Sequence, residues 1–277
     1  MPETREKIQL KALTPVIGAE VQGFDVSANL DADGFDQIHQ ALMTHQVLFF
    51  RDQQMTLAQQ KAFARHFGDL HIHPGIPGPE GHPEVIAIHA DATSTHIAGE
   101  EWHSDVSCDD APPMGSLLHM QTVPQAGGDT LFASMYAAYD ALSAPMQQML
   151  GGLTARHSGE TAYRGRYAYR GVNDMDLSYP ENDHPVVRTH PVTKRKSLFV
   201  NRIFTTHING LTAGESGTLL DYLFKHIETP EFQVRFRWRP GSVAFWDNRA
   251  VQHFAIWDYF PEVRSGYRVT ITGDRPY

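Results

Sequence analysis

Residues 242–253 read Ser-Val-Ala-Phe-Trp-Asp-Asn-Arg-Ala-Val-Gln-His, and this stretch decides the class of fold. Its first half, Ser242 to Trp246, is a short apolar run typical of a buried strand, and Asp247 and Asn248 then favour a turn. Similar runs bounded by Gly, Pro, Asp or Asn recur along the chain. The further expected strands are Val47 to Phe50, Val85 to Ile88, Ser116 to Val123, Val186 to Thr189, Ser197 to Val200, Phe232 to Trp238 and Tyr267 to Thr272.

Helical patterns are fewer than strand patterns. Two of them open with a Thr-x-x-Gln/Glu signature that satisfies free backbone amides, namely Thr56 with Gln59 and Thr212 with Glu215. A third is expected at Tyr136 to Leu142, with a break or a new start at Pro145. Because helices and strands do not alternate, a doubly wound parallel sheet is disfavoured. We expect a mainly β fold with flanking helices, a two-sheet jelly roll whose open mouth can hold a site.

The composition is that of an ordinary globular protein, with 41% hydrophobic and 20% charged residues. At 277 residues the chain lies within the range of single β-rich units, so residues 1–277 are expected to form one domain. The net charge of -9 and the lack of a Lys/Arg cluster argue against nucleic acid as a partner. No membrane span or signal peptide is expected, and with Cys108 as the one cysteine we expect a cytoplasmic protein without disulfides.

The 16 histidines motivate a search for metal-ligand spacing. His-x-Asp places two ligand types on one face of an extended segment, and it occurs at His89-Ala90-Asp91 and at His103-Ser104-Asp105. His89 ends the apolar run Val85 to Ile88, so we interpret it as a strand-end residue without a chemical role. His103 lies in a polar stretch that leads toward a Pro-Pro pair, which is typical of a ligand-bearing loop.

Two imidazoles and one carboxylate suit iron(II), because they leave three positions for oxygen and a bidentate co-substrate. His253, beyond the strand and turn at 242–248, is the candidate for the second imidazole. Arg264 and Arg268 follow four residues apart, and an extended chain would point both to one face. On an inner face they would need anionic partners such as ligand carboxylates, whereas on an edge strand they could simply face solvent.

Four motifs, taken in order and spacing, resemble the taurine dioxygenase family of iron(II)- and 2-oxoglutarate-dependent oxygenases. They are Trp102-His103-Ser104-Asp105, Gly127-Gly128-Asp129-Thr130, Trp246-Asp247-Asn248 through His253, and Arg264 with Arg268. The likeness covers nearly the whole chain, from Leu13-Thr14-Pro15 to Gly273-Asp274-Arg275-Pro276.

The resemblance implies a jelly-roll core, also called a double-stranded β-helix, and a role for each matched position. It implies that Fe(2+) is held by His103, Asp105 and His253. The distal carboxylate of 2-oxoglutarate would be bound by Arg264 and Thr130. The anionic group of the prime substrate would meet Arg268, in a pocket shared with His73 and Phe204. Trp246 would pack near the iron, and Asn248 would brace the turn before His253.

The chain departs from the pattern of taurine oxidisers at two pocket positions. It has Ile76 where they have a tyrosine, and Gly99 where they have an asparagine. Both changes remove polar groups suited to a small zwitterion and leave a more apolar or roomier pocket. We therefore expect an anion larger or less polar than taurine, such as a sulfonate, alkyl sulfate or carboxylate, held between Arg268 and His73 as a cationic end. The Tyr- and Arg-rich stretch from Tyr163 to Arg170 is a candidate lid.

This interpretation predicts a dioxygenase that uses Fe(2+), 2-oxoglutarate and O2, hydroxylates a small anionic substrate and releases succinate and CO2. A homo-oligomer, dimer or tetramer, is expected. A non-catalytic ligand-binding jelly roll would not need metal ligands and arginines in register, and a cupin-like enzyme without 2-oxoglutarate would not need Arg264 with Thr130. A halogenase of this fold would lack the carboxylate of Asp105.

Overall fold

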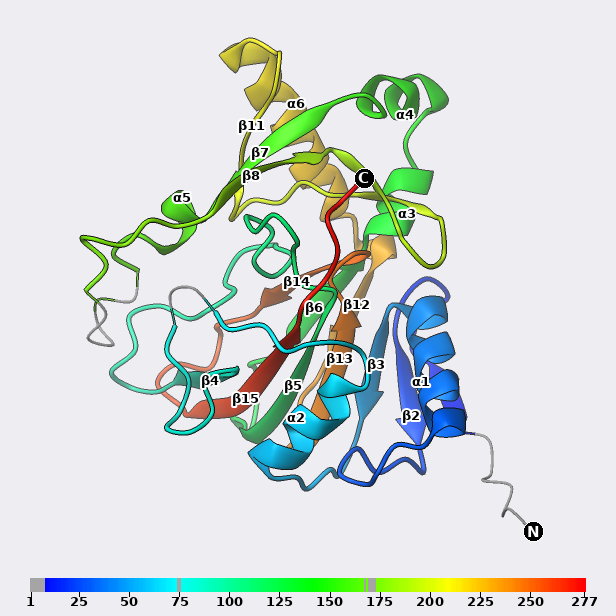
Figure 1. Cartoon of the computed structure of the whole chain (residues 1–277), viewed down its shortest axis with the longest axis vertical. Helices are drawn as coiled ribbons and strands as arrows, with labels where there is room; N and C mark the ends of the chain where they lie inside the picture. The colour runs from blue at the N-terminus through cyan, green and yellow to red at the C-terminus, as the bar shows by residue number, and fades with distance from the viewer. Residues whose placement is uncertain (1–7, 74–75, 167, 169–172) are drawn as a thin grey trace.

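The computed structural model describes residues 8–73, 76–166, 168 and 173–277, and two stacked β-sheets form its centre (Figure 1). The seven-stranded sheet has the order β1 (Gln9–Ala12), β2 (Ala19–Gln22), β3 (Val47–Phe50), β13 (Ser242–Asp247), β5 (Gly115–Thr122), β15 (Arg264–Ile271) and β4 (Val85–Ala90). The facing sheet has the order β12 (Gln233–Phe236), β6 (Thr130–Ser134) and β14 (Val251–Ala255). Neighbouring strands are antiparallel except for β2 and β3.

Alternation along the strands divides the core into an inner and an outer part. Phe49 of β3 and Trp246 of β13 point between the sheets, where Phe49 stacks on Phe236 with ring centroids 3.9 Å apart. Trp246 meets Phe132 of the facing sheet at 5.6 Å. Phe245, one residue before Trp246, packs on the other face among apolar residues of the helices. Period-two side-chain alternation therefore makes the sandwich from the apolar runs seen in the sequence.

Two helices cover the outer face of the seven-stranded sheet, α1 (Ala32–His45) and α2 (Leu57–Arg65). The expected capping box at Thr56 and Gln59 is confirmed at the start of α2. Helix α1 was not expected from the sequence, although Asp31 caps it by accepting a hydrogen bond from the Gly34 amide. Asp at an N-cap followed by apolar residues at helical spacing is the signal that could have found it.

A second layer packs against the smaller sheet, at the upper end of Figure 1. Its elements are α3 (Met135–Asp140), α4 (Ala144–Leu150), β7 (Thr154–Ser158), α5 (Gly159–Tyr163), β8 (Glu181–Pro185), β9 (Val187–Thr189), β10 (Lys196–Leu198), β11 (Thr205–Ile208), α6 (Ala213–Ile227) and the 3-10 turn η2 (Pro230–Phe232). The capping box of Thr212 and Glu215 opens α6, and Pro145 stands in the first turn of α4 as a new start. The mainly β fold with flanking helices is confirmed.

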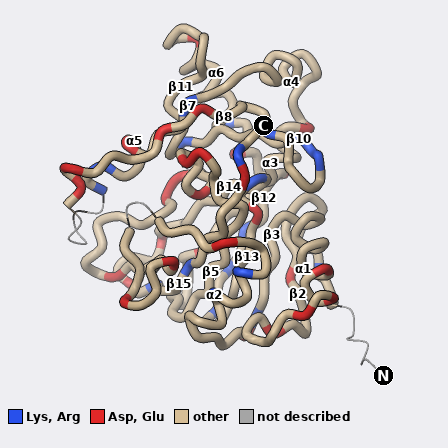
Figure 2. The backbone as a smooth tube through the Cα atoms, in the orientation of Figure 1, with Lys and Arg blue, Asp and Glu red and all other residues tan. Residues whose placement is uncertain are grey.

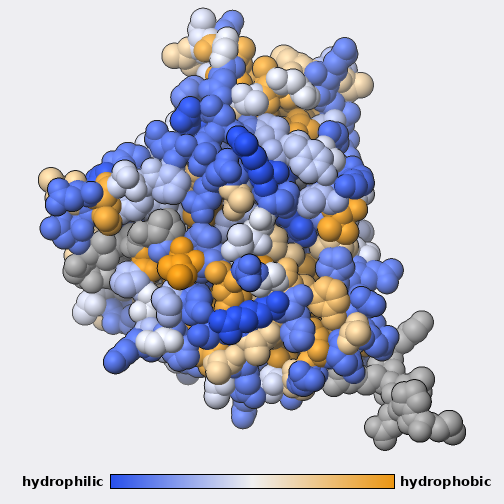
Figure 3. All heavy atoms as spheres, in the orientation of Figure 1, coloured by the Kyte–Doolittle hydropathy of each residue, from blue (hydrophilic) through white to orange (hydrophobic). Residues whose placement is uncertain are grey.

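The surface carries charge of both signs. Basic and acidic residues are interspersed along the described backbone in Figure 2, and the face seen in Figure 3 is mostly hydrophilic with scattered apolar atoms. Among the described residues, none of the helices has the length and apolar content needed to cross a membrane.

Candidate metal centre and pocket

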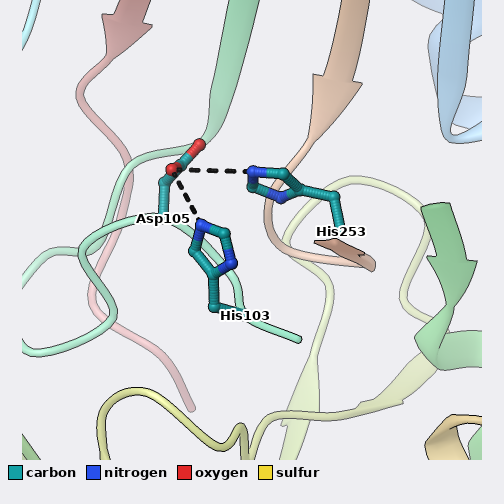
Figure 4. A group of neighbouring side chains, drawn as sticks. All are labelled: His103, Asp105 and His253. Atoms are coloured by element: carbon teal, nitrogen blue, oxygen red, sulfur yellow. Dashed lines mark ion pairs between the residues drawn. The ribbon is translucent and has the colours of Figure 1, made fainter. Parts of the chain in front are cut away.

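Three predicted ligands meet at one buried point, His103, Asp105 and His253 (Figure 4). The Nε2 atom of His103 lies 3.7 Å from Oδ1 of Asp105, and Nε2 of His253 lies 4.0 Å from the same oxygen. One nitrogen or oxygen from each side chain lies within 4.8 Å of the others. Two imidazoles and a carboxylate at these separations can coordinate one ion from one side.

The backbone brings the two histidines together. His103 and His253 form an isolated antiparallel bridge, with N–O distances of 3.1 and 2.9 Å between their peptide groups. Residues opposed in such a bridge place their side chains on the same side, and the ring centroids are 4.1 Å apart. The bridge joins the loop after Gly99 to strand β14, so the site depends on a long-range pairing.

The protonation of this group fits a metal site. His103 donates Nδ1–H to the carbonyl of Glu101 at 2.8 Å, which leaves the Nε2 lone pair directed at the site. Burial alone would raise the pKa of Asp105, but the Arg268 guanidinium holds that pKa well below its usual range. Burial lowers the pKa of His253, so its imidazole is neutral at pH 7. A carboxylate and two imidazoles form a donor set that suits iron(II).

A hydrogen-bonded support lies behind Asp105. Its Oδ2 accepts from the Ser116 hydroxyl at 2.7 Å, and Ser116 Oγ in turn accepts from Asn248 Nδ2 at 3.2 Å. Asn248 also receives the Trp246 indole N–H on its Oδ1 at 2.8 Å, and its carbonyl receives the Ser104 hydroxyl at 2.7 Å. Asn248 therefore braces the loop of Asp105 as well as the turn before His253. Sequence reasoning missed Ser116.

The two arginines share the inner face of β15, as its period predicts. The pairing of β15 with β4 is regular from Arg264 to Val269, so the two side chains stay in phase. Arg264 donates Nε–H to the Gly128 carbonyl at 3.0 Å and Nη2–H to the Thr130 hydroxyl at 3.4 Å. Arg268 donates from Nη1 to Oδ1 of Asp105 at 2.5 Å. Both guanidinium groups are buried, which excludes the solvent-facing alternative.

All ten site residues proposed from the sequence line a single pocket. They are His73, Ile76, Gly99, His103, Asp105, Thr130, Phe204, His253, Arg264 and Arg268. The pocket has further lining residues that sequence reasoning did not assign to it, namely Ile86, Ile88, Ala98, Val106, Leu118, Phe132, Ala162, Ile203 and Ala255. These are mostly apolar, and their roles depend on tertiary contacts that no local motif reveals.

His73 differs from the expectation of a cationic group. Burial, together with the nearby charge of Arg268, lowers the pKa of His73 to about 3, so the imidazole is neutral at pH 7. The expectation that Arg268 and His73 jointly form a cationic end was wrong in this respect. The His73 ring packs edge-on against Tyr163 at 5.0 Å, and Tyr163 packs in the same way against Phe204 at 5.6 Å. This side of the pocket is an aromatic wall.

Gly99 is fixed by its surroundings. Its φ is +82°, and a Cβ there would lie 2.9 Å from Cε1 of His103. Its carbonyl accepts the Ala255 amide at 2.8 Å. The absence of a side chain at Gly99 therefore does not leave space for a larger substrate. The expectation of a roomier pocket at this position was wrong. Ile76 instead joins the apolar cluster around Phe204.

The competing candidates lie apart from the metal site. His89 pairs with Asp91 at 3.1 Å on an exposed surface, where the Asp91 side chain also accepts from the Thr93 amide. Cys108 is a buried free thiol whose pKa is raised by burial, in line with a structural role. Of the candidate lid, Tyr167, Tyr169 and Arg170 lie outside the described residues, whereas Arg164 and Arg166 are described.

The comparison with protein families agrees with this geometry. The model of the family described as taurine catabolism dioxygenase TauD, TfdA matches residues 9–270. The chain belongs to this family. The alpha-ketoglutarate-dependent sulfate ester dioxygenase of Pseudomonas putida is 35% identical over 94% of this chain and 88% of its own length.

Two further similarities support the assignment to the TauD/TfdA family. The alpha-ketoglutarate-dependent sulfonate dioxygenase of Saccharomyces cerevisiae is 33% identical over 98% of this chain and 68% of its own length. The crystal structure of a taurine dioxygenase from Burkholderia xenovorans matches with a TM-score of 0.84 at 38% identity, covering 98% of this chain and 92% of that one. The family and fold expected from the sequence are confirmed.

Proposed function

We propose that His103, Asp105 and His253 hold the iron(II) of a 2-oxoglutarate-dependent dioxygenase that oxidises an anionic, sulfur-containing organic substrate. As a member of the TauD/TfdA family, the chain is a dioxygenase that requires 2-oxoglutarate. The observation that carries the metal assignment is the buried convergence of two imidazoles and one carboxylate. Bound iron would activate O2 while 2-oxoglutarate is converted to succinate and CO2.

Arg264 and Thr130 are proposed to bind the far carboxylate of 2-oxoglutarate. The guanidinium is buried, and hydrogen bonds to Gly128 and Thr130 fix its position. The Trp238 indole donates to the Thr130 hydroxyl at 2.9 Å, which further fixes that side chain. A preorganised cation in a dry pocket binds a carboxylate strongly, because little reorganisation is needed on binding.

Arg268 is proposed to bind the anionic group of the prime substrate, with His73 as a neutral hydrogen-bonding partner. Its Nε is buried without a hydrogen-bond partner among the described residues, so one donor remains for a ligand oxygen. The same pocket is lined by the aromatic wall of Tyr163 and Phe204, with Ile76 in the same apolar cluster. An anionic head and an apolar tail would fit this arrangement. Sulfonates and alkyl sulfates are therefore the proposed class, with taurine a poor substrate.

Metal binding can be tested with five variants of the chain. His103→Ala, Asp105→Ala and His253→Ala should lose bound iron and succinate formation, since each removes one of three ligands. His89→Ala and Asp91→Ala remove the other His-x-Asp pair and serve as matched controls that keep both. Iron content and succinate yield are the readouts. Loss confined to the His89 and Asp91 variants would reject the assignment.

The substrate class can be tested with a panel of taurine, longer alkyl sulfonates, alkyl sulfates and aryl-bearing acids. Catalytic efficiency should rise with apolar tail length, because each methylene buried in a fitting pocket contributes about 1 to 3 kcal/mol. Succinate formation that depends on both iron(II) and the added anion is the measurement. If taurine proves the best of the panel, the proposed pocket preference is wrong while the dioxygenase assignment stands.

We also propose that residues 1–277 act as one catalytic domain. The seven-stranded sheet combines strands from Gln9–Ala12 to Arg264–Ile271, which supports a unit that spans nearly the whole described chain.

A further inference from the structure

A third arginine borders the pocket, besides the two on β15. Arg166 lines the same cavity as His103 and Arg268. Unlike the buried pair, its side chain is 31% exposed, so it lies where the pocket meets solvent. Its Nη2 lies 2.6 Å from Oε1 of Glu100, whose side chain is 32% exposed. This ion pair, the mouth latch, therefore lies at the edge of the pocket.

The Glu100 end of the latch belongs to the loop that carries the metal ligand. Glu100 follows Gly99, whose carbonyl is tied to the Ala255 amide. It precedes Glu101, whose carbonyl accepts the His103 ring N–H at 2.8 Å. Backbone contacts on both sides of Glu100 therefore hold it in place relative to His103.

The Arg166 end belongs to the segment 159–166, which begins with helix α5. Ser158, the residue before this segment, donates its amide to the Phe204 carbonyl at 2.8 Å. Tyr163 then packs on His73 and Phe204 along the aromatic wall. Arg166 donates its amide to the Tyr163 carbonyl at 3.0 Å, which continues the turn. The latch thus joins the wall of the proposed substrate side to the metal-ligand loop across the pocket opening.

The neighbouring pair of Arg164 and Glu160 shows what a local ion pair in the same segment looks like. These residues are four apart on one helical turn, and neither lines the pocket. The partners of the mouth latch are 66 positions apart and belong to different elements. Only an ion pair between different elements, such as that of Glu100 and Arg166, can restrain one side of the pocket opening against the other.

We propose that Arg166 is a positioning residue that, through Glu100, holds segment 159–166 across the pocket opening and so retains the prime substrate. This rests on the proposed function, since it assumes that the pocket binds the substrate. The pair must separate for a substrate to pass and re-form behind it. An ion pair at this exposure is weak, so the expected effect of its loss is roughly twofold to fivefold. A weak ion pair suits this position, because it must separate and re-form in every catalytic cycle.

Hydrogen exchange of the iron- and 2-oxoglutarate-free protein tests the latch directly. Arg166→Gln and Glu100→Gln should each speed exchange in segment 159–166 by roughly twofold to fivefold, because loss of the ion pair lowers the free energy needed to open this segment. The double variant should exchange no faster than either single one, and the swap of Glu100→Arg with Arg166→Glu should restore slow exchange. Arg156→Gln breaks a similar pair with Asp183, at 2.8 Å and away from the pocket, and should leave the segment unchanged. Unchanged exchange in both single variants, or additive effects, would overturn the proposal.

Kinetics with hexyl sulfate as the probe give a second readout. Both single variants should raise KM for hexyl sulfate by the same factor, while KM for 2-oxoglutarate stays unchanged. Equal increases in both KM values would show a general structural defect and overturn the positioning role. If the wild-type protein forms no succinate under any condition, the proposed function fails. The exchange experiment still decides on the latch in that case.

Discussion

Arg268 and Asp105 lie 163 positions apart in the sequence, yet Nη1 of the arginine donates to Oδ1 of the carboxylate at 2.5 Å. The same carboxylate oxygen lies nearest to both histidine Nε2 atoms. The cation assigned to the substrate anion is thus in direct contact with a proposed metal ligand. The proposed substrate cation and the proposed metal site would therefore be electrostatically coupled through this short contact.

Replacing Arg268 should weaken binding of the prime substrate much more than binding of 2-oxoglutarate. Loss of one partner of a buried charged pair typically costs roughly 2 to 5 kcal/mol, so Arg268→Ala should weaken substrate binding about thirtyfold or more. Titration of the absorption band from iron and the keto acid measures 2-oxoglutarate binding, which should persist. Arg268→Lys keeps the charge without the planar fork and should recover only part of the loss.

Replacing Arg264 should give the opposite pattern. Arg264→Ala removes the buried cation beside Thr130, and the concentration of 2-oxoglutarate needed for half-maximal binding should rise about thirtyfold or more. Thr130→Val removes one hydroxyl and should have a smaller effect in the same direction. If the band titration shows that Arg268→Ala loses 2-oxoglutarate and Arg264→Ala does not, the two roles must be exchanged.

Substituting Gly99 should disturb the metal site through a single methyl group. Gly99→Ala places a Cβ against the His103 ring in addition to the strain of a positive φ. Gly81 is a matched control, because its φ is +74° and a Cβ there meets nothing within 4 Å. Both variants should lose about 1 to 2 kcal/mol of stability from backbone strain, and only Gly99→Ala should also bind iron more weakly. Thermal unfolding and iron affinity separate the two effects. Equal iron affinity in both variants would contradict the contact argument.

Acidification should destabilise the fold through His157, a fully buried residue. Burial lowers the pKa of His157 to about 3, while the unfolded chain titrates near 6.5. Between these values the unfolded state binds more protons, so the free energy of unfolding falls as pH falls below about 6.5. At pH 5.5 the loss from this group is about 1.3 kcal/mol relative to pH 7. Urea unfolding of the metal-free protein at several pH values measures it, and His157→Gln should show a shallower dependence. An unchanged pH slope in that variant would contradict the assignment.

Local patterns predicted the sandwich, because strand alternation has a short period, and the His-x-Asp spacing predicted His103 and Asp105 as a proposed ligand pair. His253 joins that pair only through the long-range bridge. The choice of His103 over His89 rested on the polar setting of one triplet, and period two placed Arg264 and Arg268 on one face. Strands such as β14 were missed, because Val251–Ala255 mixes polar and apolar residues and is held mainly by its pairing with β6. The neutral state of His73 depends on burial among residues far along the chain. The same holds for the contact between Glu100 and Arg166, which no spacing rule could reveal.

The pairing of the His103 and His253 backbones has a consequence for how the protein is made. His103 and His253 are neighbours only through a long-range bridge, so they cannot meet until the last strands have joined the sandwich. A nascent or partly folded chain therefore has no complete metal-binding site. Iron should therefore leave the rate of folding nearly unchanged and instead slow unfolding, because it stabilises contacts absent from the transition state. Bound iron would therefore raise the kinetic stability of the folded protein without helping it to fold.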